Sequence, residues 1–202
     1  MLKNPILAFS VLVWFITSGC DAHHEHPLNH SMKDLSAALH ARDMNALKAV
    51  LSSQTLDELD EAFTALSKVH QSSKALPETK RQALAKGLPK SVTTGNKTTF
   101  LLDLANQRLS TLRLNPQTAF GLEIDDIQQE NDSSALVITN SGQRFTFTRE
   151  DKVWKVHLFK APLTKLLSEA RQLQQAITLT IERTQHRNQI KTVLESTKRT
   201  TK

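Results

Sequence analysis

Four histidines lie within ten residues near the start of the chain, and this spacing could hold a metal ion. The segment runs from Asp21 to His30, and its ligands would be His23, His24, His26 and His30. Imidazole and carboxylate groups suit Zn, Cu or Ni, and short His-rich tracts have a metal-binding composition. No second cluster in the sequence completes a fixed site, and Pro27 favours an extended chain. We therefore interpret residues 20–32 as a polar tether, with loose binding of Zn or Cu as the alternative.

The single cysteine, Cys20, follows an apolar stretch over residues 6–16. About a dozen apolar residues suit the core of a signal peptide and are too few for a transmembrane span of ~20 residues. Ser18 and Gly19 before the cysteine resemble the lipobox of bacterial lipoproteins, although Thr17 stands where leucine is usual. That resemblance implies cleavage before Cys20 and its acylation, and multiple acyl chains hold a protein at a membrane stably. An ordinary secretory signal is the alternative.

Composition and missing motifs exclude several protein classes. The 202 residues include 26 Lys and Arg against 20 Asp and Glu, a net charge of +6, and 39% are hydrophobic. These values exclude a polytopic membrane protein, a disulfide-rich scaffold, collagen and extensive disorder. The sequence contains no Gly-rich phosphate loop and no GxSxG, HExxH or CxxC motif. Its basic tail lacks interleaved aromatic residues, so it matches anionic lipid headgroups better than nucleic acid.

After the His-rich segment, the first half of the chain is predicted to be helical. Apolar residues recur at helical spacing over 33–75, and Asp43 precedes a fresh apolar period, which predicts a corner between two helices capped by Asp43. A further helix is expected to begin near Leu56, and shorter helices are expected over 77–88 and 97–112. The helix from Leu56 would carry four acidic residues in its first turn: Asp57, Glu58, Asp60 and Glu61. They favour the start of a solvated helix over paired catalytic carboxylates.

The second half is predicted to contain a small sheet and a long helix. Alternating apolar and polar residues predict four strands, over 120–125, 135–139, 143–149 and 153–159. Their short connections predict an antiparallel meander. From Leu163 the apolar spacing becomes helical again and continues to Ile181, and we call this apolar stripe the 163–181 face. The predicted fold class is therefore α+β, with N-terminal helices, an antiparallel β-meander and a long C-terminal helix.

Two segments resemble the NTF2-like superfamily, which is also described as cystatin-like or SnoaL-type. Residues 38–51, with their corner at Asp43, are similar to its first helical corner. Residues 143–159, which contain Asp-Lys-Val-Trp-Lys-Val, are similar to its closing hairpin. The resemblance covers residues 31–160, with a longer helical part and an added C-terminal helix. It implies a sheet curled around a helix into a cone, which is often a ligand pocket and sometimes an active site.

The resemblance also supplies candidate catalytic residues, because catalytic members use an Asp or a His inside the cone. The candidates in this chain are Asp43, Asp125, Asp126 and His157. Each has a structural alternative: a helix cap for Asp43, a strand end for the neighbouring pair of aspartates, and a half-exposed sheet surface shared with Lys155 for His157. An acid–base pair must converge in space, and the sequence shows no such convergence, so a non-enzymatic role is favoured.

We expect a lipoprotein signal peptide over 1–19, a His-rich tether over 20–32, an NTF2-like domain over 33–160, and a C-terminal helix with a basic tail over 161–202. The expected function is that of a lipid-anchored protein on the periplasmic or extracytoplasmic face of a cell membrane, binding a protein partner or a small ligand. A partner or a second copy would dock on the 163–181 face, unless that face packs on the protein's own sheet. The alternatives are a small-molecule enzyme and metal binding through the tether.

Overall fold

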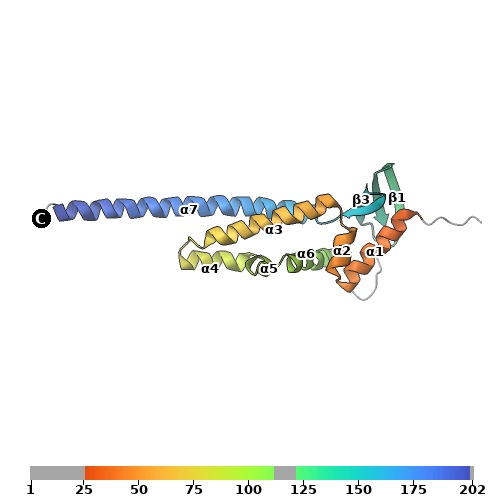
Figure 1. Cartoon of the computed structure of the whole chain (residues 1–202), viewed down its shortest axis with the longest axis horizontal. Helices are drawn as coiled ribbons and strands as arrows, with labels where there is room; N and C mark the ends of the chain where they lie inside the picture. The colour runs from red at the N-terminus through yellow and green to blue at the C-terminus, as the bar shows by residue number, and fades with distance from the viewer. Residues whose placement is uncertain (1–25, 112–121, 201–202) are drawn as a thin grey trace, which may run out of the picture.

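The computed structural model describes residues 26–111 and 122–200. Six helices come first: α1 (Pro27–Ala41), α2 (Met44–Val50), α3 (Ser53–Ser73), α4 (Glu78–Gly87), α5 (Lys90–Thr93) and α6 (Lys97–Thr111). Four strands and a last helix follow: β1 (Ile124–Asn131), β2 (Ser134–Thr139), β3 (Arg144–Glu150), β4 (Val153–His157) and α7 (Lys160–Thr200). The sheet lies with α1 and α2 at one end of an elongated molecule, and α7 extends towards the other end (Figure 1). The predicted α+β class is confirmed.

The corner between α1 and α2 is built as the sequence predicts. The Oδ1 atom of Asp43 accepts hydrogen bonds from the backbone N–H groups of Asn45 at 2.9 Å and Ala46 at 3.0 Å. Asp43 therefore caps α2 by satisfying two of the N–H groups that have no partner inside the helix. Arg42 just before it adopts a left-handed conformation with φ of 54°, which ends α1.

The start of α1 differs from the expected extended tether, because the helix already begins at Pro27. Proline suits the first helical position, where its fixed φ is favourable and its missing N–H is not needed. His26 caps the helix, since its Nδ1 atom accepts a hydrogen bond from the N–H of Leu28 at 3.3 Å. Leu28 and Met32 are buried in the core. Residues 27–32 are thus part of the folded domain rather than of a tether.

The start of α3 also differs from the expectation. Ser52 is the N-cap, and its Oγ atom accepts a hydrogen bond from the N–H of Thr55 at 3.2 Å. The helix therefore begins at Ser53, and no acidic residue lies in its first turn. A carboxylate from elsewhere takes that place: both side-chain oxygens of Glu150, at the end of β3, accept from the N–H of Ser53 at 3.0 and 3.1 Å. A negative charge at this position favours the positive end of the helix dipole.

The sheet is the predicted antiparallel meander, with strand order β1-β2-β3-β4. The first strand begins at Ile124 and runs to Asn131, so the expected strand over 120–125 is displaced towards the C-terminus, and Phe120 lies outside the described residues. Pairing with Leu136, Ala135 and Ser134 of β2 extends β1 beyond its apolar residues, a tertiary effect that alternation cannot show. Between β2 and β3, Gly142 adopts φ of 74°, a conformation that glycine tolerates without strain.

One hydrophobic cluster joins the sheet to the helices. Phe145 and Phe147 point to the buried side of β3, and Trp154 and Val156 do so from β4. The extended chain between α2 and α3 runs beside β4, where Leu51 pairs with Val156 in a parallel bridge. The helical half of the core contains Phe100 of α6, whose ring centroid lies 5.6 Å from that of Phe63 on α3. The bridge between Leu51 and Val156 and the packing of α1 and α2 on β4 fix the first two helices against the last strand.

The long C-terminal helix is confirmed, and its 163–181 face packs on α3 rather than on the sheet (Figure 1). Leu163, Ala170 and Ile177 of this face are buried. Polar contacts flank them, among them a 3.1 Å hydrogen bond from Gln174 to the Ser72 hydroxyl. Residues 182–196, by contrast, are all exposed. Within residues 26–111 and 122–200, no helix is long and apolar enough to cross a membrane.

Candidate functional site: a groove between α1, α2 and β4

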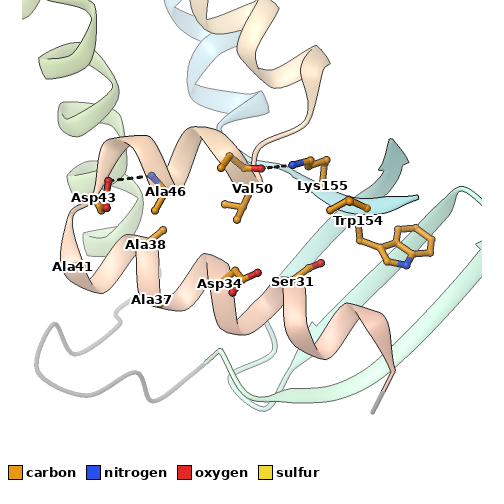
Figure 2. A pocket seen from close by; sticks show the side chains of 12 residues that line it. Ser31, Asp34, Ala37, Ala38, Ala41, Asp43, Ala46, Val50, Trp154 and Lys155 are labelled. Atoms are coloured by element: carbon orange, nitrogen blue, oxygen red, sulfur yellow. Dashed lines mark hydrogen bonds between the residues drawn. The ribbon is translucent and has the colours of Figure 1, made fainter. Parts of the chain in front are cut away.

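An open groove of about 470 Å³ lies where the first two helices meet the last strand (Figure 2). This volume falls in the range of ~300–1,000 Å³ that is usual for small-molecule sites. Helix α1 forms one wall and helix α2 forms the other, while Trp154 and Lys155 of β4 lie at one end. The lining is more apolar than polar, and it is made of Ser31, Asp34, Ala37, Ala38, Ala41, Asp43, Ala46, Ala49, Val50, Val153, Trp154 and Lys155.

Small side chains create the groove. Five of its lining residues are alanines, three on α1 and two on α2, and their spacing of three and four residues places them on one face of each helix. The corner at Asp43 reverses the chain, so the two alanine-lined faces meet (Figure 2). A methyl group reaches too short a distance to fill the space between them. The groove is therefore a consequence of the alanine positions on the two helices.

The strand end of the groove is fixed by backbone bonds. The N–H of Ser52 donates to the carbonyl oxygen of Val156 at 3.0 Å, which ties the chain after α2 to β4. The Lys155 ammonium donates to the carbonyl oxygen of Ala49, near the C-terminal end of α2 (Figure 2). A cation at this end of a helix complements its dipole. Because Lys155 is engaged with the backbone, it serves to close the groove on the strand side.

The groove is lined by two carboxylates and one ammonium group, that of Lys155, so negative charges outnumber positive ones. Asp34 on α1 is exposed, and its Oδ2 atom lies 3.6 Å from Nε2 of His30 one turn earlier. Asp43 is also exposed and uses Oδ1 for its two capping hydrogen bonds. Both carboxylates border a mainly apolar surface. Such a surface suits a ligand with an apolar body and a positively charged group.

Asp43 and His157, two of the four catalytic candidates from the superfamily resemblance, are not brought together in this groove. Asp43 lines it, whereas His157 does not. Both ring nitrogens of His157 have partners: Nδ1 lies 3.0 Å from the Ser52 hydroxyl, and Nε2 is hydrogen-bonded to the Thr148 hydroxyl. Ser52 is fully buried and also caps α3. This contact ties β3 and β4 to the start of α3, and His157 shares a half-exposed strand face with Lys155, as predicted.

The other acidic candidates lie on the protein surface. Asp125 and Asp126 are exposed on β1, and Asp126 accepts a 2.9 Å hydrogen bond from Gln128. On α3, Asp60 forms an ion pair with Lys97 of α6, and Glu61 lies 3.4 Å from Arg171 of α7. These pairs link α3 to its neighbouring helices, in keeping with the prediction that the acidic run belongs to a solvated helix surface.

Two of the four predicted metal ligands fall within the described part of the chain. His26 caps α1, and His30 pairs with Asp34 on the next turn. Among the described residues, no three His, Cys, Asp or Glu side chains form a group that could hold a metal ion. His23, His24 and the predicted lipidation residue Cys20 lie outside the described residues. Metal binding and lipidation therefore stay predictions.

A partly buried arginine, Arg108, lies away from the groove, on α6. The Nε atom of Arg108 is buried and has no hydrogen-bond partner among the described residues. Burial lowers the pKa of Arg108 because removal from water disfavours the charged form. An unsatisfied buried donor costs the folded state free energy, so Arg108 does not stabilise α6 through a hydrogen bond at this atom.

Sequence reasoning found Asp43 but missed the rest of the groove. Asp34 and Ser31 lie in or next to the segment that was interpreted as a tether, and alanines carry no chemical signal by themselves. Comparison with protein families, with curated proteins and with solved structures gives no match for this chain. The cone implied by the resemblance to the NTF2-like superfamily is not confirmed, and the resemblance stays a prediction.

Proposed function

We infer that this protein is a lipid-anchored binding module of the extracytoplasmic face, which holds a ligand in the groove between α1, α2 and β4. The observation that carries this proposal is the groove itself, a space of about 470 Å³ bordered by alanines and by two exposed carboxylates. Binding is favoured over catalysis because the candidate acids and the candidate histidine are separately engaged in capping, strand and surface contacts.

The chemistry of the groove selects the ligand class. Asp34 and Asp43 attract a positive charge, and the Lys155 ammonium is already bonded to the Ala49 carbonyl oxygen. The alanines and Val50 offer an apolar surface whose burial drives binding. We propose that the ligand has an apolar body and an amine, as a small molecule or as a basic side chain of a peptide.

The proposed anchor lies close to this site along the chain. Cys20 stands seven residues before Pro27, where α1 begins, and α1 forms one wall of the groove. Acylation at Cys20 would therefore keep the groove near the membrane. The support for acylation comes from the lipobox-like Ser18-Gly19-Cys20 sequence after the apolar stretch.

Fluorescence of Trp154 tests binding in the groove. Trp14 lies within the predicted signal peptide, so Trp154 is the only tryptophan from Cys20 onwards, and it lines the groove. A chain that begins at residue 20 and carries Cys20→Ser is titrated with 4-phenylbutylamine and with 4-phenylbutanoate, which differ in the sign of their charge. We expect a saturable change in emission with the amine and binding at least about tenfold weaker for the carboxylate.

Variants show whether the groove is responsible. Ala37→Phe fills the groove and should abolish the response, and Asp34→Asn should weaken amine binding about fivefold or more. Asp126→Asn is the matched control, because Asp126 is an exposed aspartate on β1 that does not line the groove. Equal binding of the two probes, or equal binding by the Ala37→Phe chain, would contradict the proposed site.

A further inference from the structure

The C-terminal part of α7 has no role in the fold described above. The helix continues to Thr200, while its buried positions end at Ile177. Every residue from 182 to 196 is exposed, and this part extends past α3 and α4 (Figure 1). A helix without tertiary packing is marginal in water. Its length beyond the packed region therefore needs another explanation.

We call residues 182–200 the basic end of α7, and its described side chains, over 182–196, include both positive charges and apolar groups. Residues 182–200 hold five Lys and Arg against two acidic residues, Glu182 and Glu195. Ile190, Val193 and Leu194 are exposed by 48%, 62% and 58%. Large apolar side chains that gather on an exposed helix mark an interaction surface.

The charges and the apolar side chains share one side of the helix. At 100° per residue, Arg183, Arg187, Ile190 and Leu194 fall within about 60° of one another, and Lys191 lies about 40° further round the helix. The buried residues Ala170 and Ile177 fall on the opposite side. The outward side of the basic end is thus separate from the 163–181 face that packs on α3. It is free to contact a partner while the fold stays intact.

We propose that the basic end of α7 binds an anionic lipid surface. Guanidinium and ammonium groups pair with headgroup phosphates, while isoleucine, valine and leucine enter the boundary between headgroups and acyl chains. One helix side that offers both kinds of side chain matches this layered surface. A second copy is a poorer occupant, because two such helices would place Arg183, Arg187 and Lys191 against like charges.

This inference does not depend on a ligand in the groove, and it predicts an orientation. The groove lies on α1 and α2 at one end of the molecule, and the basic end of α7 lies at the other (Figure 1). The 41 residues of α7 span about 60 Å at 1.5 Å per residue. A chain anchored before α1 can bring both ends to the same bilayer only with its long axis along the membrane surface.

Vesicle flotation tests the proposal. The chain from residue 20 with Cys20→Ser, which cannot be acylated, is mixed with vesicles of phosphatidylcholine alone or with 30% phosphatidylglycerol, a composition chosen as about one anionic lipid in three. We expect binding to the anionic vesicles, little binding to the neutral ones, and loss of binding at high salt because screening weakens the attraction.

Two charge variants make the test specific to the basic end. The triple variant R183Q/R187Q/K191Q should bind about a hundredfold more weakly, since each charge near an anionic surface contributes about fivefold. The control K80Q/K86Q removes exposed charges on α4 and should bind within about twofold to threefold of the parent chain, the usual spread of such contributions. Circular dichroism and the Tm confirm that both variants fold.

The double variant I190S/L194S should also weaken binding while leaving the net charge unchanged. Three results would overturn the proposal: no binding to anionic vesicles, equal binding by the triple variant and its control, or equal binding to neutral vesicles. Self-association in sedimentation velocity that is lost in I190S/L194S, without vesicle binding, would assign the surface to a second copy instead.

Discussion

Two isoleucines on α7 allow a direct test of which part of this helix packs in the core. Ile177 is 2% exposed and packs in the core cluster, whereas Ile190 is 48% exposed thirteen residues later on the same helix. Replacing either by alanine removes the same three carbons. Burial alone therefore decides the difference between the two variants.

The expected free energies differ severalfold. An Ile→Ala change in a packed core costs about 2–5 kcal/mol, because apolar contacts are lost and a cavity is left. At an exposed position the change is within about 0.5 kcal/mol, and alanine is the better helix former. We expect Ile177→Ala to reduce the free energy of unfolding by at least about 2 kcal/mol and Ile190→Ala to leave it nearly unchanged.

Urea unfolding followed by circular dichroism measures the difference. With a slope m of about 2 kcal/mol per M, Ile177→Ala should lower the midpoint by about 1–2.5 M, while the midpoint of Ile190→Ala should stay within about 0.3 M of the parent chain. Equal midpoint shifts for the two variants, or a larger shift for Ile190→Ala, would refute the packing of the 163–181 face on α3.

Three further predictions follow from single side chains. Asp43→Ala should lower the free energy of unfolding by about 1 kcal/mol while Asp43→Asn keeps the cap; denaturation that ranks the two variants equally would argue against capping. Ser52→Ala removes the N-cap of α3 and the partner of His157 Nδ1, so urea unfolding should show a free energy of unfolding lowered by about 1–3 kcal/mol. A larger loss in Ser53→Ala would contradict this assignment. Burial lowers the pKa of Arg108. The charged side chain therefore destabilises the folded state at every pH below that pKa, and this destabilisation is lost only as the pH rises through the pKa. Arg108→Met should therefore keep or raise the Tm at neutral pH, and a drop of about 5 °C or more would contradict this account.

Local signals were sufficient for several elements of the fold. The Asp43 cap depends on residues two and three positions away, so the sequence predicts it correctly. The long helix from Leu163 follows from its regular apolar spacing, and the meander follows from alternating strands with short connections. Each of these features is decided by neighbours along the chain.

Features that depend on distant residues could not be predicted. His157 meets the Ser52 hydroxyl across 105 positions of sequence, and Glu150 meets the N–H of Ser53 across 97. The prediction of an extended chain at Pro27 is wrong, because proline is also favoured at the first helical position. The groove arises from small side chains on two helices and from a strand that packs on them late in the sequence. No short sequence motif predicts such a groove.

The central claim about where the protein acts, the lipid anchor, depends on a mature chain that begins at an acylated Cys20. Intact mass and membrane fractionation of the natively expressed protein, beside a Cys20→Ser variant, test it most directly. We predict a wild-type mass that corresponds to residues 20–202 plus acyl groups, wild-type protein in the membrane fraction, and release of the variant from it. A soluble wild-type protein without acyl mass would contradict the lipid anchor and would leave Cys20 as an ordinary thiol of a secreted binding protein.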